Sequence, residues 1–542
     1  MFNFKPLTLK WNFVTLTIGI LILSNTFSAI SGTHEEKRDV IQIMNIVPSP
    51  DDLEVNSAAD IELYFRNVKW FKEELVGSGI ASPTISDLDG DGNMEIIILT
   101  SNSIIYILDH LGNFVPGWGS PGIVGVDEEL TSDLGVSPYP LAIDLNNDGI
   151  KEILVATYNP GTIQAYYLNT SKVPGWDISI GYRATSSLAS GDIDGDGEDE
   201  IVIGSWDSNI YAFEKSGAIV SGFPYTAATN QIISTPALSN VDGIPGLEII
   251  FSSYDSNLYI INGSGYLLPG WPQSASYQIR ASPAIADLDN DSDMEIIIGS
   301  WDRNLYVYHH DGTPLGIWPW DSGSAILNSA VIADINRDGY KDFIIQPSNI
   351  TLYAFTNARN SKTYEWVNIK SEFTYEDAII ANIDRDPYPE IIEVARSGKV
   401  MIYSHNGTLL YSKLISDKGI QASPAIGDID GDGYLDIIFT TTGVGLTWDL
   451  SDVYCYSLGG LGLLPWPSIR GGNERIGEPA DDDKDGLSNL EEEMLGTING
   501  VQDSDGDGIK DGDEVYFYYL NPTVNDIDED TDEDGLTNKD EV

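Results

Sequence analysis

An acidic loop that recurs eight times constrains this sequence more than any other feature. The loop has the form Asp-x-Asp-x-Asp-Gly-x-x-Glu, and successive copies start 46 to 57 residues apart, most often 47 or 48. A period of this length indicates one supersecondary unit that is repeated around a ring or along a stack. The eight copies begin at Asp87, Asp144, Asp192, Asn240, Asp287, Asp334, Asn382 and Asp428.

The residues between the loops are patterned as short strands. In the fifth copy, residues 282–287 alternate in polarity, and residues 294–299 form an unbroken apolar run that suits burial on both faces. Two further strands are expected at residues 305–308 and near Trp318. Four short antiparallel strands per unit are typical of a propeller blade, whereas the i, i+3, i+4 apolar spacing of helical repeats is absent. The sequence therefore predicts an all-β, eight-bladed β-propeller over residues 59–476.

The number of blades depends on how the ring closes. Residues 61–72 have the pattern of an outer strand that precedes the first complete unit. If this strand pairs with the last repeat, it closes a ring of eight, and the segment from Trp466 to Arg470 lies outside the ring. A ring of seven blades is the alternative.

The N-terminal segment indicates export. A basic start is followed by an apolar run over residues 11–23 and then by small and polar residues up to Ser31. This order is typical of a signal peptide, and the run is too short for a membrane-spanning helix. We expect a signal peptide over residues 1–31, a linker over 32–58, and a secreted or cell-surface protein. An uncleaved N-terminal anchor is the alternative.

The charge of the chain excludes several classes of partner. With 28 basic and 84 acidic residues, the formal net charge is −56. Such a surface repels nucleic acids and anionic membranes, so we expect no contact with either, apart from an uncleaved anchor in a membrane. The single cysteine, Cys455, excludes an intrachain disulfide, and its strand-like surroundings predict a small buried residue. We expect a monomeric propeller.

The acidic loops have the composition of a calcium site. Carboxylates at positions 1, 3, 5 and 9 converge on one point, and glycine at position 6 permits the turn. All these ligands are oxygen atoms, which calcium prefers, whereas zinc or copper would call for histidine or cysteine, and neither occurs in the loops. Four copies carry the full carboxylate set. They are Asp87, Asp89, Asp91 and Glu95; Asp192, Asp194, Asp196 and Glu200; Asp287, Asp289, Asp291 and Glu295; and Asp428, Asp430, Asp432 and Asp436.

The other copies depart from the pattern to different degrees. Copies two and six have asparagine at position 3 and keep a site with fewer charges. Copy seven has Pro387 in place of the glycine, so we expect weak binding in that copy. Copy five has Ser292 in place of its glycine but keeps its carboxylates. Copy four has Ile244 at position 5, and we expect this loop to be empty. The predicted ligands are Asp144, Asn146, Asp148 and Glu152 in copy two; Asp334, Asn336, Asp338 and Asp342 in copy six; and Asn382, Asp384, Asp386 and Glu390 in copy seven.

Residues 477–542 form a different module. Three loops have carboxylates at positions 1, 3 and 5, glycine at position 6, and glutamate at position 12, which is the bidentate ligand of an EF-type calcium loop. A module with so few apolar residues would need calcium to organise it. The predicted ligands are Asp481, Asp483, Asp485 and Glu492; Asp503, Asp505, Asp507, Asp511 and Glu514; and Asp530, Asp532, Asp534 and Glu541.

The repeated motif resembles the FG-GAP/VCBS repeats found in the propellers of integrin α-chains and in many secreted microbial proteins. The run from Ala281 to Asp291, followed by Met294 to Gly299, is close to that family's pattern. The resemblance covers roughly residues 80–460. It implies a propeller with calcium bound in the hairpin between the first two strands of a blade. The C-terminal loops are similar to the calcium repeats of thrombospondin type 3 stalks.

No catalytic constellation is recognisable, so the sequence favours a binding or adhesion module for a glycan or a protein. We expect the binding face to lie opposite the acidic loops, where Trp206, Tyr254 and Trp301 each begin a turn that continues with aspartate and asparagine. These aromatic side chains could stack on sugars, or they could pack between blades while the polar residues fix the turn. The alternatives are a calcium-dependent polysaccharide lyase that uses Arg183 or Arg280, and a purely structural surface or stalk component.

Overall fold

The structure is a computed structural model that describes most of the propeller region. The predicted signal peptide, the linker over 32–58 and the segment from Trp466 to Arg470 lie outside the described residues. The part of the chain that is described contains strands and turns but no helix, and hence no helix that could span a membrane. The described residues are 65–76, 81–100, 104–119, 124–125, 138–158, 161–226, 228–291, 293–356, 366–369, 374, 377–383, 388–420, 422–432, 434–442, 450–461, 501–504, 506 and 509–510.

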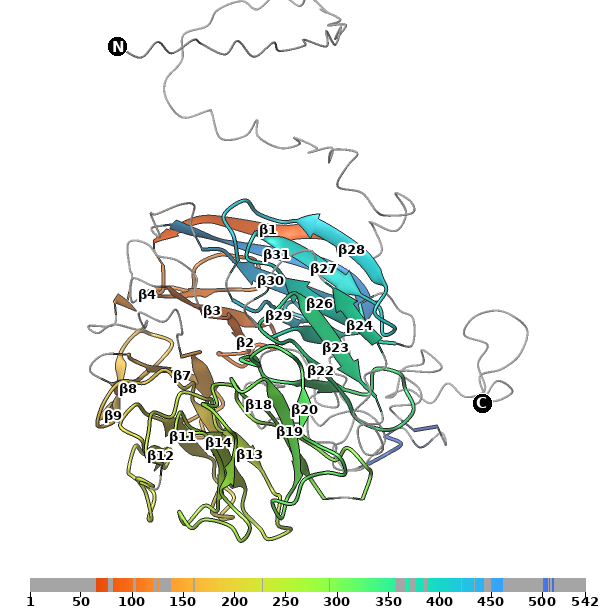
Figure 1. Ribbon diagram of the computed structural model, residues 1–542. Coiled ribbons are helices and arrows are strands. Elements are labelled where there is room, and N and C mark those ends of the chain that lie inside the picture. Colours follow the sequence, from red (N-terminus) through yellow and green to blue (C-terminus); the bar gives the residue numbers. More distant parts are fainter. Residues whose placement is uncertain are drawn as a thin grey trace, which may run out of the picture. The chain divides into compact units, whose positions relative to one another are not determined.

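Eight antiparallel sheets follow one another along the chain and form the blades of a β-propeller (Figure 1). Seven sheets have four strands; the third has three, and an isolated bridge between Ile210 and Tyr225 lies where its fourth strand would be. The strands of blades one to four are β2 (Thr84–Ser86), β3 (Glu95–Thr100), β4 (Ile104–Leu108), β5 (Val124–Gly125); β6 (Leu141–Ile143), β7 (Glu152–Ala156), β8 (Thr162–Tyr166), β9 (Lys172–Ser179); β10 (Ala189–Gly191), β11 (Glu200–Gly204), β12 (Ile210–Phe213); and β13 (Ala237–Ser239), β14 (Glu248–Ser252), β15 (Asn257–Ile261), β16 (Gln273–Ser274). Those of blades five to eight are β17 (Ala284–Ala286), β18 (Glu295–Gly299), β19 (Asn304–His309), β20 (Trp320–Asp321); β21 (Val331–Ala333), β22 (Asp342–Ile345), β23 (Thr351–Phe355), β24 (Trp366–Ile369); β25 (Ile379–Ala381), β26 (Glu390–Val394), β27 (Lys399–Tyr403), β28 (Leu409–Leu414); and β29 (Ala425–Gly427), β30 (Tyr434–Thr440), β31 (Leu450–Leu461), β1 (Phe65–Val76).

The N-terminal strand closes the ring. Strand β1 pairs antiparallel with β31, from Phe65 opposite Leu458 to Val76 opposite Leu450, and so becomes the outer strand of blade eight. The predicted closure and the count of eight blades are confirmed, and the alternative of seven blades is wrong. The blade is completed by two segments that lie at opposite ends of the repeat array (Figure 1).

The burial of the strands follows their position in the blade. Each second strand is an apolar run packed on both faces, and β7, β11, β14 and β18 are buried at all five positions. Outer strands such as β9 and β28 are largely exposed or half-buried, although Trp176 and Tyr411 point inward and are buried. The core therefore lies between neighbouring blades, as expected for units that cannot bury their apolar surface alone.

Neighbouring blades share both apolar clusters and hydrogen bonds. One cluster joins blade eight to blade one and contains Ile96, Ile438 and Cys455, so the prediction of a buried Cys455 is confirmed. The backbone N–H of Met94 in blade one donates to the carbonyl of Ile429 in blade eight (2.9 Å). Five tryptophan indoles donate from an outer strand or its preceding turn to a carbonyl of the next blade, over 2.6–2.9 Å; they belong to Trp70, Trp118, Trp176, Trp271 and Trp366.

Candidate metal centres

Each acidic loop connects the first strand of a blade to the second, and its first aspartate organises the backbone. In blade three, the carboxylate of Asp192 accepts hydrogen bonds from the N–H groups of Gly195 (2.6 Å), Asp196 (3.0 Å) and Gly197 (2.9 Å). Gly197 has φ 91°, a left-handed conformation that favours glycine. The carboxylate at position 1 thus folds the loop around itself and brings the side chains at positions 3 and 9 near the same point.

The carboxylate at position 9 is buried, and one of its oxygens accepts a hydrogen bond from the N–H group of position 2. This bond is present in all eight blades, with N–O distances of 2.8–3.3 Å. The residue at position 2 is a buried leucine, isoleucine or valine in every blade, and its apolar side chain anchors the turn. The position-9 residues are Glu95, Glu152, Glu200, Glu248, Glu295, Asp342, Glu390 and Asp436.

Burial makes these carboxylates hard to ionise in the absence of a cation. Burial and the neighbouring loop carboxylates raise the pKa of Glu95 and Glu200 to about 7, although the hydrogen bond from position 2 lowers it. The same causes raise the pKa of Glu295 and Asp342 to about 8. A divalent cation in the loop would favour the charged forms and remove this cost.

The structure brings together the predicted ligands in several loops. Groups whose ligand atoms all lie within 4.8 Å of one another occur in blades one, three, five and eight. Each of the three groups in blades one, three and eight comprises positions 1, 3 and 9, whereas Asp91, Asp196 and Asp432 at position 5 are not part of them. The groups are Asp87, Asp89 and Glu95; Asp192, Asp194 and Glu200; Asp428, Asp430 and Asp436; and, in blade five, both Asp287, Asp289 and Asp291 and Asp289, Glu295 and His309.

Unsatisfied carboxylate oxygens in loops three and six are suited to a cation. Glu200 Oε1 and Asp342 Oδ1 are buried and have no hydrogen-bond partner among the described residues, and both side chains are fully buried. A buried oxygen without a donor is costly, and a cation would satisfy it. In blade two, the amide of Asn146 donates to Glu152 Oε1 (3.1 Å), so this oxygen has a hydrogen-bond donor without a cation.

Loops four and seven differ from the others. In loop four, the Asn240 side-chain amide donates to the carbonyl of Ile244 (2.9 Å), so the loop is bridged by its own side chain. Glu248 nevertheless keeps its hydrogen bond to the N–H of Val241 (2.9 Å). In loop seven, Asp384, Asp386 and Pro387 lie outside the described residues, and only Asn382 and Glu390 of the predicted ligands are described.

Loop eight already contains a positive charge. The Lys69 ammonium from strand β1 lies 2.5 Å from Asp430 Oδ1, 2.7 Å from Asp436 Oδ2 and 3.6 Å from Asp432 Oδ2. Burial alone would lower the pKa of Lys69, but its hydrogen bonds to these carboxylates raise it. An internal ammonium therefore occupies the position that the sequence predicts for calcium. Sequence reasoning missed Lys69 because it is 361 residues from Asp430.

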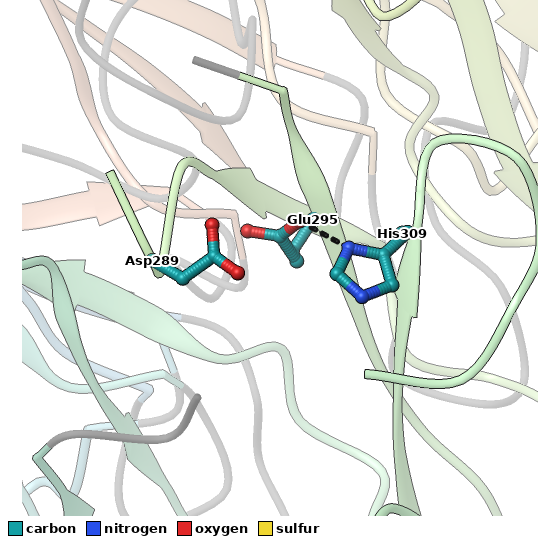
Figure 2. Close-up of side chains that lie close together, drawn as sticks. All are labelled: Asp289, Glu295 and His309. Atoms are coloured by element: carbon teal, nitrogen blue, oxygen red, sulfur yellow. Dashed lines mark hydrogen bonds and ion pairs between the residues drawn. The ribbon is translucent and has the colours of Figure 1, made fainter. Parts of the chain in front are cut away.

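Blade five brings a histidine to its loop, which the sequence analysis also missed. His309 at the end of β19 is paired in register with Glu295 at the start of β18. Its Nδ1 lies 2.9 Å from Glu295 Oε1, and Asp289 of the loop faces the same point (Figure 2). Counting outward from the turn at residues 300–303 would have placed His309 opposite Glu295.

Of the predicted tail ligands, only Asp503 lies within the described residues. In the second C-terminal loop, Asp503 Oδ1 accepts a hydrogen bond from the N–H of Gly506 (2.7 Å), and Ile509 is buried. The other predicted ligands of the three tail loops lie outside the described residues.

The opposite face of the ring carries a series of aromatic residues at the turns between second and third strands. The aspartates there fix the turns: Asp207 accepts hydrogen bonds from the N–H of Asn209 (3.0 Å) and from the Tyr211 hydroxyl (2.6 Å). The same arrangement recurs at Asp255 and Asp302. The aromatic rings are half-buried and pack between blades, so most of their surface is used within the protein. The contacts include Tyr158 with Trp206, and Tyr254 and Tyr277 with Trp301.

The fold and these loops define an eight-bladed β-propeller with acidic hairpin loops. Three stretches, residues 144–203, 287–345 and 347–439, match the FG-GAP-like repeat family. These three stretches of the propeller are therefore FG-GAP-like repeats, as the motifs predicted.

Solved structures that are similar to this one include proteins of distant sequence. The biofilm matrix protein Bap1 of V. cholerae has a TM-score of 0.54 at 13% identity, over 79% of this chain and 96% of that one. Sqt1 of Saccharomyces cerevisiae has a TM-score of 0.51 at 10% identity, over 72% and 100%. BamB of Moraxella catarrhalis has a TM-score of 0.47 at 12% identity, over 71% and 97%. At these identities the similarity concerns the fold alone. No curated protein matches the chain in sequence.

Proposed function

We propose that this chain is a secreted or cell-surface, calcium-stabilised β-propeller that binds a glycan or a protein through the face opposite its acidic loops. The observation that carries the proposal is the aromatic series on that face, at Tyr158, Trp206, Tyr254 and Trp301 in four consecutive blades. Tyr158 is buried and the other three rings are half-buried, and Trp301 stacks against the more exposed Tyr277 in the segment that connects blade four to blade five. Aromatic side chains held rigidly on a protein scaffold are frequent anchors for ligands.

Two tyrosines on this face are available to a partner. Tyr182 is 46% exposed and Tyr277 is 53% exposed. Tyr277 stacks on Trp301 with a centroid distance of 6.3 Å, and the Arg183 guanidinium lies 5.3 Å from the Tyr182 ring. Arg183 also donates to the Tyr158 hydroxyl (2.6 Å), so its contacts favour a supporting role over the catalytic role required for a lyase.

Paired substitutions on the two faces test the binding surface. We expect Tyr182→Ala with Tyr277→Ala to weaken glycan or protein capture at least tenfold in an array screen of the calcium-loaded full chain. The matched control is Tyr266→Ala, because Tyr266 is 71% exposed but lies on the face of the acidic loops. Equal loss in both variants would contradict the proposed face. Cleavage of a polysaccharide would favour the lyase, and the absence of any ligand would favour a purely structural role.

Calcium is proposed for the loops because the donor atoms are all oxygen in most of them and some are buried without partners. We expect EDTA to lower the melting temperature of the propeller and excess calcium to restore it. Asp194→Asn at position 3 of loop three should reduce the calcium-dependent part of the stabilisation. Asp242→Asn, at the same position of loop four, should leave that part unchanged, because loop four is bridged by Asn240. A melting temperature that EDTA does not change would contradict the calcium proposal.

A further inference from the structure

The loop of blade five differs from the other acidic loops in the chemistry of its ligands. The groups of candidate ligands in blades one, three and eight contain carboxylates alone. In blade five, one of the two groups consists of Asp289, Glu295 and His309 and so contains an imidazole. Imidazole nitrogen is a common ligand of zinc and other transition-series cations, while calcium prefers oxygen. We propose that blade five binds a transition-series divalent cation, with zinc as the representative, on Asp289, Glu295 and His309.

The strand pairing fixes two of the three ligands. Glu295 and His309 are direct partners in the β18–β19 ladder, so their side chains lie next to each other on the same face of the blade. His309 Nδ1 and Glu295 Oε1 are 2.9 Å apart (Figure 2). Two ligands that are each about 2 Å from a zinc ion lie about 3 Å from each other in a tetrahedral site, so this separation suits a shared metal.

The third ligand has an unsatisfied oxygen at this point. Asp289 Oδ1 is buried and has no hydrogen-bond partner among the described residues. The carboxylate of Asp289 faces those of Glu295, Asp287 and Asp291. A cation bound between Asp289, Glu295 and His309 would satisfy this oxygen.

The site is held rigidly and can still be reached. Glu295 is fully buried, and its other oxygen, Oε2, accepts a hydrogen bond from the N–H of Leu288 (2.9 Å), which fixes its orientation. The His309 side chain is 27% exposed, so an ion can enter from the loop side. Three protein ligands leave a fourth position for water, as in open zinc sites. This proposal does not require calcium in the other loops.

Zinc titration of the full, EDTA-stripped chain tests the proposal. We expect the wild type to bind one zinc ion tightly by calorimetry, and a millimolar excess of calcium to leave this ion bound. His309→Gln keeps a hydrogen-bond donor beside Glu295 but lacks the imidazole, and it should weaken binding at least tenfold while keeping the wild-type melting temperature in EDTA. The control is His110→Ala, which removes a histidine from the corresponding turn of blade one.

A second variant tests the geometry by creating a site. Glu214 follows strand β12 in blade three at the position that corresponds to His309. Glu214→His should therefore add a second zinc equivalent, formed with Asp194 and Glu200. The proposal is overturned if His309→Gln binds zinc as tightly as the wild type, if calcium displaces the zinc, or if the wild type binds no zinc.

Discussion

At the scale of single residues, the position-9 carboxylate has a structural role that does not depend on a cation. In all eight blades one of its oxygens accepts the N–H of position 2, and this includes loop four, which lacks a ligand at position 5. Glu248 of that loop is 3% exposed, and burial raises its pKa to about 7. Its presence alone is therefore no evidence that a loop binds metal, and the carboxylates at positions 1 and 3 are the better indicators.

The raised pKa of Glu248 gives a prediction about pH. As the pH rises from about 4.5 to about 7, the unfolded chain loses this proton while the folded chain keeps it, so Glu248 makes the protein less stable across that window. Glu248→Gln removes the ionisation and keeps an acceptor for Val241. We expect the variant to equal the wild type near pH 5 and to exceed it by about 1–3 kcal/mol at pH 8 in EDTA.

Chemical unfolding at the two pH values measures this difference. Glu248→Ala serves as the control, because it loses the acceptor for Val241 and should be less stable than Glu248→Gln at both values. The same pH dependence in wild type and Glu248→Gln would show that Glu248 does not titrate in this range.

At the scale of strands and hairpins, local pattern predicts most of what is found. Strands β17, β18 and β19 of blade five fall within one or two residues of the positions that the apolar alternation and the turns predict. The sequence does not show directly which side chains of neighbouring strands contact an acidic loop. Lys69 comes from a strand at the far end of the chain, and His309 comes from a third strand whose register must first be known. Both side chains change the expected ligand chemistry of a loop whose own carboxylates already match the calcium pattern.

The Lys69 ammonium predicts that loop eight becomes calcium-dependent when this charge is removed. Lys69→Gln leaves the fully buried Asp436 beside Asp430 without a cation, so we expect a loss of about 3 kcal/mol in EDTA. Calcium should restore most of this loss, because the emptied position has the oxygen ligands it prefers. Melting temperatures of wild type and Lys69→Gln, measured with and without calcium, test this prediction.

A second ion pair, between the segment that precedes blade eight and its strand β31, provides the control for this experiment. Lys418 contacts the buried Asp452 at 2.7 Å, away from any acidic loop. Lys418→Gln should lower stability without any rescue by calcium beyond that seen in the wild type. If calcium rescues both variants equally, or neither, loop eight is not a latent calcium site.

At the scale of the whole propeller, stability depends on the pairing of β1 with β31. The apolar cluster between blades eight and one includes Leu75 of β1, and Trp70 of the same strand donates its indole N–H to the carbonyl of His110 in blade one (2.8 Å). Strand β1 thus contacts both blades at the junction. The sequence predicted this closure because a strand-like segment precedes the first complete unit.

Two truncations separate this strand from the residues before it. Removal of residues 1–50, which precede β1 and include the predicted signal peptide, should leave the melting temperature of the propeller within about 2 °C of the full chain. Removal of residues 1–76 should lower it by 10 °C or more, because the outer strand of blade eight and Lys69 are lost. A propeller that melts normally without residues 65–76 would contradict the role assigned to β1.

The closure also sets the order in which the protein can be completed. Lys69 and its partner Asp430 are 361 residues apart, so β1 is made long before the strand it pairs with. At a synthesis rate of 5–20 residues per second, its edge stays unpaired for roughly 20 to 70 s. Blades one to seven can pack against one another in this interval, but the last one cannot form. We therefore expect the nascent chain to remain an open arc with an unprotected strand, a stage at which chaperones and aggregation compete for it.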